Sequence, residues 1–257
     1  MSKIGNEERY LELVERVMMK GDTKPSRTGN VISLPGQQLV LDVLGGAFPI
    51  LTTRKMYPRG VIGEALTLIQ TDATSAADFK ERGCSYWDRW TDKNGKLVLD
   101  YSIKDKLPKL IEGIKKDLNG RRHIIDLWND ERLPELSLPC CHYSYQFVVY
   151  DNYIDMIWTQ RSADLAVGVP SDMLLATIYL RLVASKTGLI ARDVYMNFGD
   201  AHIYEDHIEG LKTMLVKIPK KEPLLVIGDR PLDKLTNKDF YIIGYRHEDP
   251  VRFTLHV

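Results

Sequence analysis

Residues 173–186 are nearly all apolar, and this stretch constrains the fold more than any other feature of the chain. A helix that is apolar on every side must be surrounded by protein, because no face of it can be left in water. We therefore expect a buried central helix with Asp172 as its N-cap. A chain of 257 residues can build the enclosing layers without disulfides or metals. We treat residues 1–257 as a single domain.

The remaining periodicity predicts a mixed α+β fold around this helix. Apolar residues recur at helical spacing in three further segments, which are residues 6–20, 59–70 and 107–118. Residues 87–100 are rich in Asp, Asn and Gly and predict loops. Strand patterns occur at residues 31–43 (interrupted by Pro35 and Gly36), 123–128, 144–149, 154–160 and, as a further strand pair, 194–197 and 224–227.

Composition excludes several classes of function. The 35 basic and 35 acidic residues cancel, so we expect no direct nucleic-acid partner, and any anion site must be local. No apolar run reaches the roughly 18 residues of a membrane span, and residues 1–8 lack the apolar core of a signal peptide. The three cysteines form no disulfide framework, which favours a reducing cytoplasm. The six histidines show no ligand-like spacing, so we expect no metal.

Two neighbouring segments carry a nucleophile and a cation. Cys140, Cys141 and His142 directly precede one predicted strand, and Arg161 and Ser162 end the next. A thiolate is a strong nucleophile, and an arginine nearby both lowers the thiol pKa and binds anions. The alternative is a half-buried, inert cysteine pair beside a surface arginine.

The surroundings of these residues favour the reactive interpretation. Eight segments, spread over nearly the whole chain and in the same order, resemble the thymidylate synthase family. They are residues 26–29 (SRTG), 48–53 (FPILTT), 87–90 (WDRW), 121–122 (RR), 138–147 (LPCCHYSYQF), 160–164 (QRSAD), 168–170 (GVP) and 199–204 (GDAHIY).

The resemblance implies a thymidylate synthase-like α+β fold, with a large twisted mixed sheet that packs back to back in a homodimer. It also implies that Cys141 adds to C6 of a pyrimidine nucleotide, so that C5 can take up a one-carbon unit. Glu64 matches the general acid/base, with Asn129 and Tyr101 supporting its water network. Cys140 stands where the family usually has proline, and we interpret it as a packing residue.

The resemblance further assigns nucleotide and folate ligands. Arg121 and Arg122 match the pair that reaches the phosphate across the dimer interface; without the resemblance, a solvated basic turn is the better interpretation. The other expected nucleotide ligands are Arg27, Gln160, Arg161, Ser162, Asp164, His202 and Tyr204. The expected ligands of 5,10-methylenetetrahydrofolate are Trp87, Trp90, Asp164, Gly168 and Val257.

One departure from the family pattern concerns the base. Residues 169–172 (VPSD) place Asp172 where the family has its base-reading asparagine. An amide complements the N3–H donor and O4 acceptor of uracil, whereas cytosine presents an N3 acceptor and an N4 amino donor. A carboxyl group can accept from N4 and share a proton with N3. The substitution therefore indicates the cytidylate branch of the family, as in the bacteriophage dCMP hydroxymethylases.

Our first hypothesis is a deoxycytidylate 5-hydroxymethyltransferase that makes 5-hydroxymethyl-dCMP for modified DNA, in the host cytoplasm if the source is a phage. A dCMP methyltransferase and a thymidylate synthase acting on dUMP are the alternatives. Ser171 and Tyr57 depart from the family pattern on the folate side of the site, and the smaller, polar Ser171 favours water over hydride as the final reactant. A non-catalytic nucleotide-binding regulator is a remote alternative, since Cys141, Glu64, Arg161 and Asp164 occur together.

Overall fold

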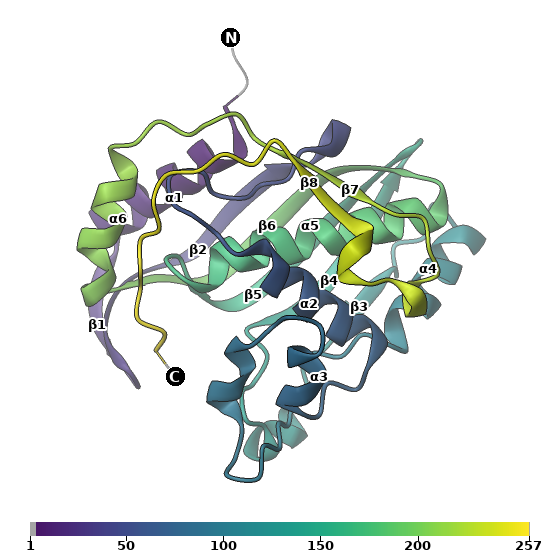
Figure 1. Cartoon of the computed structure of the whole chain (residues 1–257), viewed down its shortest axis with the longest axis horizontal. Helices are drawn as coiled ribbons and strands as arrows, with labels where there is room; N and C mark the ends of the chain where they lie inside the picture. The colour runs from purple at the N-terminus through teal and green to yellow at the C-terminus, as the bar shows by residue number, and fades with distance from the viewer. Residues whose placement is uncertain (1–3, 257) are drawn as a thin grey trace.

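The computed structural model describes residues 4–256, which fold as helices on a large sheet (Figure 1). The helices are α1 (Asn6–Lys20), α2 (Pro58–Gln70), α3 (Ala76–Lys80), α4 (Lys106–Lys116), α5 (Gly168–Thr187) and α6 (Ile208–Leu215). The strands are β1 (Asp22–Ser26), β2 (Gly29–Asp42), β3 (Ile124–Asp126), β4 (His142–Tyr150), β5 (Tyr153–Asp164), β6 (Ile190–Tyr204), β7 (Leu224–Ile227) and β8 (Phe240–Ile243).

Six strands form one mixed sheet in the order β1-β2-β6-β5-β4-β3. All neighbours are antiparallel except β5 and β6, which run parallel. A parallel pair needs a long crossover, and α5 is that crossover. The predicted mixed α+β architecture with a large mixed sheet is confirmed.

Helix α5 is buried, as its apolar sequence predicts. It lies between the sheet and α2, with contacts to β5 and β6 on one side and to α2 on the other (Figure 1). Most of its side chains between Met173 and Ala184 are fully enclosed. The sheet and α2 thus supply the layers that this segment requires.

The predicted start of this helix is wrong. Asp172 is not the N-cap, because α5 begins at Gly168 and Val167 occupies the cap position without a side-chain hydrogen bond. Pro170 lies in the first turn, where a missing backbone N–H costs nothing since those N–H groups have no intrahelical partner. Asp172 is therefore one turn inside the helix, with its carboxylate directed to Gln160 of β5.

The other predicted helices are present with small shifts. The apolar stripe of α1, with Tyr10, Leu13, Val14 and Val17, is buried, and Gly21 ends the helix as expected. Helix α4 ends at Lys116, so Leu118 falls outside it and is exposed.

The sheet differs from prediction in its long-range pairing. The segment on both sides of Pro35 and Gly36 is one strand, β2, which pairs with β6 throughout. The predicted pairing of residues 194–197 with 224–227 is wrong, because the former lie in β6 of the large sheet and β7 pairs with β8. Helix α6 and strands β1 and β8 were not predicted.

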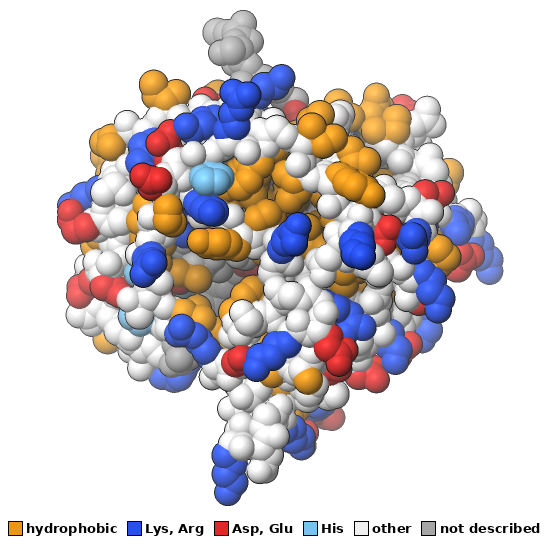
Figure 2. Space-filling view, viewed as in Figure 1, with side chains coloured by type: hydrophobic (Ala, Val, Ile, Leu, Met, Phe, Trp, Pro, Cys, Tyr) orange, Lys and Arg blue, Asp and Glu red, His pale blue; other side chains and the backbone are white. Residues whose placement is uncertain are grey.

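The exterior agrees with the balanced composition. On the face drawn in Figure 2, Lys and Arg side chains are interspersed with Asp and Glu rather than gathered into one basic field. Within residues 4–256, no helix combines the length and the hydropathy needed to cross a bilayer.

Candidate active site

Cys141 lies at the start of β4, at the end of a loop that two contacts hold in place. Its backbone N–H donates to the Tyr101 hydroxyl at 2.6 Å, and its carbonyl accepts from the backbone N–H of Arg161 at 2.8 Å. The side chain is partly exposed, whereas Cys140 is buried. Cys141 is therefore the more accessible of the two cysteines, and Cys140 packs in the core as predicted.

The Arg161 guanidinium is tied to the same loop. Its Nε donates to the Cys140 carbonyl at 2.8 Å and its Nη2 to the Pro139 carbonyl at 3.0 Å. Burial raises the pKa of the Cys141 thiol, and the positive charge of Arg161 opposes that rise. The lowered thiol pKa expected from sequence is therefore not the net result in the ligand-free chain, although Arg161 acts in the expected direction.

A cluster of aromatic rings, made of Tyr101, His142, Tyr145 and Trp158, packs next to the cysteine loop. The Tyr101 ring packs on the His142 imidazole, with ring centroids 4.5 Å apart. The Trp158 ring packs on both His142 and Tyr145, with centroid distances of 4.3 Å and 4.7 Å. Burial lowers the pKa of His142 to about 3, so this imidazole is neutral and bonds to the Tyr145 hydroxyl. His142 thus orients the start of β4 without carrying charge.

Glu64 lies on the buried face of α2 and is linked through Trp87 to this cluster of aromatic rings. Its carboxylate accepts from the Tyr86 hydroxyl at 2.5 Å and from the Trp87 indole N–H at 2.9 Å. Trp87 in turn packs against Tyr101, with ring centroids 5.7 Å apart. Burial raises the pKa of Glu64 to about 7 despite the two hydrogen bonds. A carboxyl group with this pKa can exchange protons near neutrality.

Asp172 faces the cysteine from α5. Its Oδ2 accepts a 2.9 Å hydrogen bond from Nε2 of Gln160, whose Oε1 accepts from the indole N–H of Trp158 at 3.1 Å. Burial, opposed by the Gln160 bond and reinforced by the charges of Glu64 and Asp164, raises the pKa of Asp172 to about 8. This carboxyl group keeps its proton at neutral pH, within electrostatic reach of Cys141.

A thiol, an arginine and two carboxyl groups of raised pKa therefore meet at one end of the sheet. Comparison with known families shows where this constellation belongs, because residues 8–257 match the family model described as thymidylate synthase. The chain belongs to the thymidylate synthase family. Members of this family are one-carbon transferases, and they use 5,10-methylenetetrahydrofolate as co-substrate in folate-dependent transfer to a nucleotide.

The thymidylate synthase-family residues of the β5–α5 turn lie beside Asp172. The Asp164 carboxylate accepts from the backbone N–H groups of Ala166 at 2.8 Å and Val167 at 3.2 Å, which shapes the turn. A Cβ on Gly168 would lie 3.7 Å from Oδ2 of Asp172 and 3.9 Å from Cβ of Asp164. Asp164, Gly168 and Asp172 therefore border one space.

The expected sugar ligands lie on β6 beside the C-terminal tail. After β8 the chain crosses back over the molecule toward α6 (Figure 1). There the His256 ring stacks on Tyr204 at 3.9 Å and bonds to the Thr28 carbonyl at 3.1 Å. His202 packs edge-on against Tyr204 at 5.6 Å. Val257 lies outside the described residues, so its predicted folate contact stays a prediction.

The expected phosphate ligands fall into two groups. Arg27, in the β1–β2 hairpin, lines a hollow of about 510 Å³ with Trp90, Arg89 and Pro139, and so approaches the cysteine loop. Arg121 and Arg122 precede β3 at the edge of the sheet and are exposed, and their guanidinium groups have no hydrogen-bond or ion-pair partner among the described residues. Ser162 lies on β5 next to Arg161 and is partly exposed.

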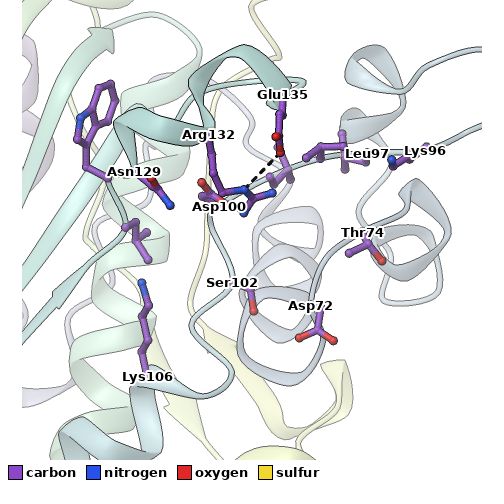
Figure 3. A pocket seen from close by; sticks show the side chains of 14 residues that line it. Asp72, Thr74, Lys96, Leu97, Asp100, Ser102, Lys106, Asn129, Arg132 and Glu135 are labelled. Carbon is purple, nitrogen blue, oxygen red and sulfur yellow. Dashed lines mark hydrogen bonds and ion pairs between the residues drawn. The ribbon is translucent and has the colours of Figure 1, made fainter.

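Asn129 lies apart from the Glu64 cluster. It caps the 3₁₀ turn Asp130–Glu135 and lines a cavity of about 810 Å³ together with Asp100, Arg132 and Glu135 (Figure 3). Its predicted role in the water network near Glu64 stays a prediction. The structure instead gives Glu64 the Tyr86 and Trp87 donors.

The thymidylate synthase-family co-substrate fits the residues present. Trp90, Leu138 and Pro139 offer apolar surface to a planar ring, and Arg89 in the same hollow offers a cation to a carboxylate, while Arg27 there is the expected phosphate ligand. Sequence reasoning missed Arg89, Tyr86 and Trp128, whose ring lies under Arg161. The signal for Arg89 and Tyr86 was their place in or beside residues 87–90, and nothing in the sequence singles out Trp128.

Proposed function

We propose that this chain hydroxymethylates dCMP at C5 to give 5-hydroxymethyl-dCMP, with Cys141 as the nucleophile. Asp172 and Gln160 read the base, while Arg27, Arg161 and Ser162 bind the phosphate. Bound 5,10-methylenetetrahydrofolate supplies the one-carbon unit, with Trp87, Trp90, Asp164, Gly168 and Val257 as its ligands.

The single observation that carries the substrate assignment is the carboxyl group of Asp172 at the base-reading position. With a pKa raised to about 8, it can give a proton to N3 of cytosine and then accept from both N3–H and N4–H. Uracil N3 already bears a proton, so it cannot receive another there. The Gln160 bond at 2.9 Å holds the carboxyl group in one orientation for this exchange.

The same proton prepares the ring for attack. Protonated N3 withdraws electron density from C6, so the Cys141 thiol loses its proton to water and its sulfur forms a bond there while the C5–C6 π pair moves to C5. C5 then bonds to the one-carbon unit, and loss of the C5 proton expels tetrahydrofolate and leaves an exocyclic methylene. Water adds to this methylene to give the hydroxymethyl group, and departure of the Cys141 thiolate from C6 restores the ring double bond. Glu64, with a pKa of about 7, is placed to exchange the protons that these steps move.

The proposed assembly is a back-to-back homodimer in which Arg121 and Arg122 complete the partner's phosphate site. Ile157 and Tyr195 are cross-strand partners that alternate with the buried residues of β5 and β6. Partly exposed apolar side chains thus lie on the sheet face away from α5. A second copy would cover them, and would give the exposed arginines a ligand.

The deciding experiment measures kcat/KM for dCMP and dUMP with the wild-type protein and Asp172→Asn, and identifies the product by mass spectrometry. The wild type should prefer dCMP, and the amide should shift the preference toward dUMP by about tenfold or more, since a mismatched buried hydrogen bond costs about 1–3 kcal/mol. A wild type that prefers dUMP, or an unchanged ratio, contradicts the cytidylate assignment. A methylated product contradicts the hydroxymethylation.

A further inference from the structure

Trp128 is an exposed aromatic residue that packs on the active-site arginine. It lies two residues after the end of β3 and is 40% exposed. The Arg161 guanidinium lies over this ring, with Cζ 5.7 Å from the ring centroid. Tyr143 of β4 supports the indole edge-on at 6.1 Å.

The position of the Trp128 ring is fixed by the backbone around it. The Trp128 N–H donates to the Asp126 carboxylate at 3.1 Å, and the N–H of Leu127 donates to the Tyr143 carbonyl at 2.8 Å. The second bond extends the β3–β4 ladder toward the cysteine loop. The ring is therefore carried by the sheet rather than by a free loop.

The Arg161 guanidinium is held at its edge by two backbone carbonyls and on one face by the Trp128 ring. Of the five N–H groups of a guanidinium, the contacts to Cys140 and Pro139 use two, which leaves three, all on Nη1 and Nη2. Those remaining groups form the fork that binds a phosphate in two-point geometry. The ring covers one face of the cation, which limits its rotation and keeps water from that side.

We propose that Trp128 is a positioning residue that holds Arg161 in the orientation required both to bind the substrate phosphate and to act on the Cys141 thiol. This role rests on the proposed function, since it takes Arg161 as the phosphate ligand and Cys141 as the nucleophile. Leucine and phenylalanine are both smaller than tryptophan and apolar, but only phenylalanine keeps a π face that attracts the cation. The aromatic face, and not the bulk, is thus what the role needs.

The test compares Trp128→Leu with Trp128→Phe, each in a Cys140→Ala background so that Cys141 is the reactive thiol followed. One readout is the pH dependence of Cys141 alkylation by iodoacetamide, and the other is the Kd of dCMP. Besides Arg161, the groups that act on the pKa of the Cys141 thiol are Asp172 and Asp164 through their charges and Tyr101 through a hydrogen bond, and none of them is altered. Tyr150→Leu removes a comparable cation–aromatic contact, with Arg192 at 5.2 Å, and is the matched control.

We expect Trp128→Leu to move the alkylation midpoint upward by about 0.5 pH unit and to raise the Kd of dCMP about threefold. Trp128→Phe should restore most of both, and Tyr150→Leu should change neither. In an Arg161→Ala background, Trp128→Leu should have no further effect. Equal values for Trp128→Leu and wild type, a loss of thermal stability alone, or the same shifts without Arg161 would overturn the role. Failure of the wild type to bind dCMP would instead count against the proposed function, because the alkylation arm needs no nucleotide.

Discussion

At the scale of single residues, the site is defined by two buried carboxyl groups whose pKa values are raised. Asp172 and Glu64 are enclosed by rings and by α5, and their nearest hydrogen-bond donors are neutral groups from Gln160, Tyr86 and Trp87. Neutral donors offset only part of the cost of burying a negative charge. Both pKa values are therefore raised, to about 8 and about 7.

The raised pKa of Asp172 predicts a stability that falls with pH. Its pKa is about 8 in the folded chain and 3.8 when unperturbed, so between these values the folded state binds more protons than the unfolded state. Stability is then fully present below about pH 4 and is lost as the pH rises through about 8. Asp172→Asn removes this dependence. The free energy of unfolding of the variant minus that of the wild type should therefore increase by at least about 1 kcal/mol between pH 5 and 8.

Urea unfolding at the two pH values measures this difference. Asp229→Asn is the control, because that carboxylate is exposed and its pKa is lowered by Lys186. If the stability gap between Asp172→Asn and wild type is the same at both pH values, the Asp172 carboxyl group is ionised in the folded protein and cannot give its proton to cytosine.

At the scale of elements, a single glutamate of α1 holds the loop that supports the site. The buried Glu7 carboxylate accepts from the backbone N–H groups and hydroxyls of Thr52 and Thr53, at 2.5–2.8 Å. Arg54, next in this loop, donates to the Ala166 carbonyl at 2.6 Å in the β5–α5 turn. Helix α1 therefore reaches the turn that carries Asp164 and Gly168 through two polar contacts.

We predict that Glu7→Gln lowers the free energy of unfolding by about 3 kcal/mol, because the amide nitrogen would face donors that now have an acceptor. Denaturant unfolding measures the loss, and Glu12→Gln on the exposed face of α1 is the matched control. Glu7→Gln should also raise the KM for the folate co-substrate. A loss below 1 kcal/mol would mean that the loop holds its shape without the carboxylate.

At the scale of the whole molecule, one chain leaves its basic pair and its outer sheet face without a partner among the described residues. Arg121 and Arg122 follow α4 and precede β3, the edge strand of the sheet. Exposed arginines with no acceptor bind anions at little cost, because no existing contact has to be broken. This arrangement fits a site that two chains complete together.

Shared sites predict complementation between two inactive variants. Arg122→Ala and Cys141→Ala should each abolish turnover, and mixing them under conditions of verified subunit exchange should restore activity. Random pairing makes half of the dimers mixed, each with one intact site, so recovery should approach about one quarter of the wild-type rate. No recovery in the exchanged mixture would place both arginines in the site of their own chain.

The sequence predicted local features better than long-range ones. The buried helix and the stripe of α1 follow from periodicity, and the packed Cys140 follows from the resemblance of short segments. The start of α5 was misplaced because Pro170 was not recognised as a first-turn residue. The pairing of β6 and β7 was wrong because register between distant strands depends on the whole sheet. The Trp128 contact was not predicted because it depends on the guanidinium of Arg161, which is far from Trp128 in the sequence.

The α5 crossover has a consequence for how this protein acquires its site. Cys141 directly precedes β4, Gln160 and Asp172 belong to β5 and α5, and the parallel β5–β6 pair is connected through α5. Loop closure over such a connection slows folding, and no local hairpin can assemble the three residues early. Affinity for ligand should therefore appear only with the fully folded chain. A partly folded chain released during synthesis would be catalytically silent, and nucleotide would act as a selective stabiliser of the finished molecule.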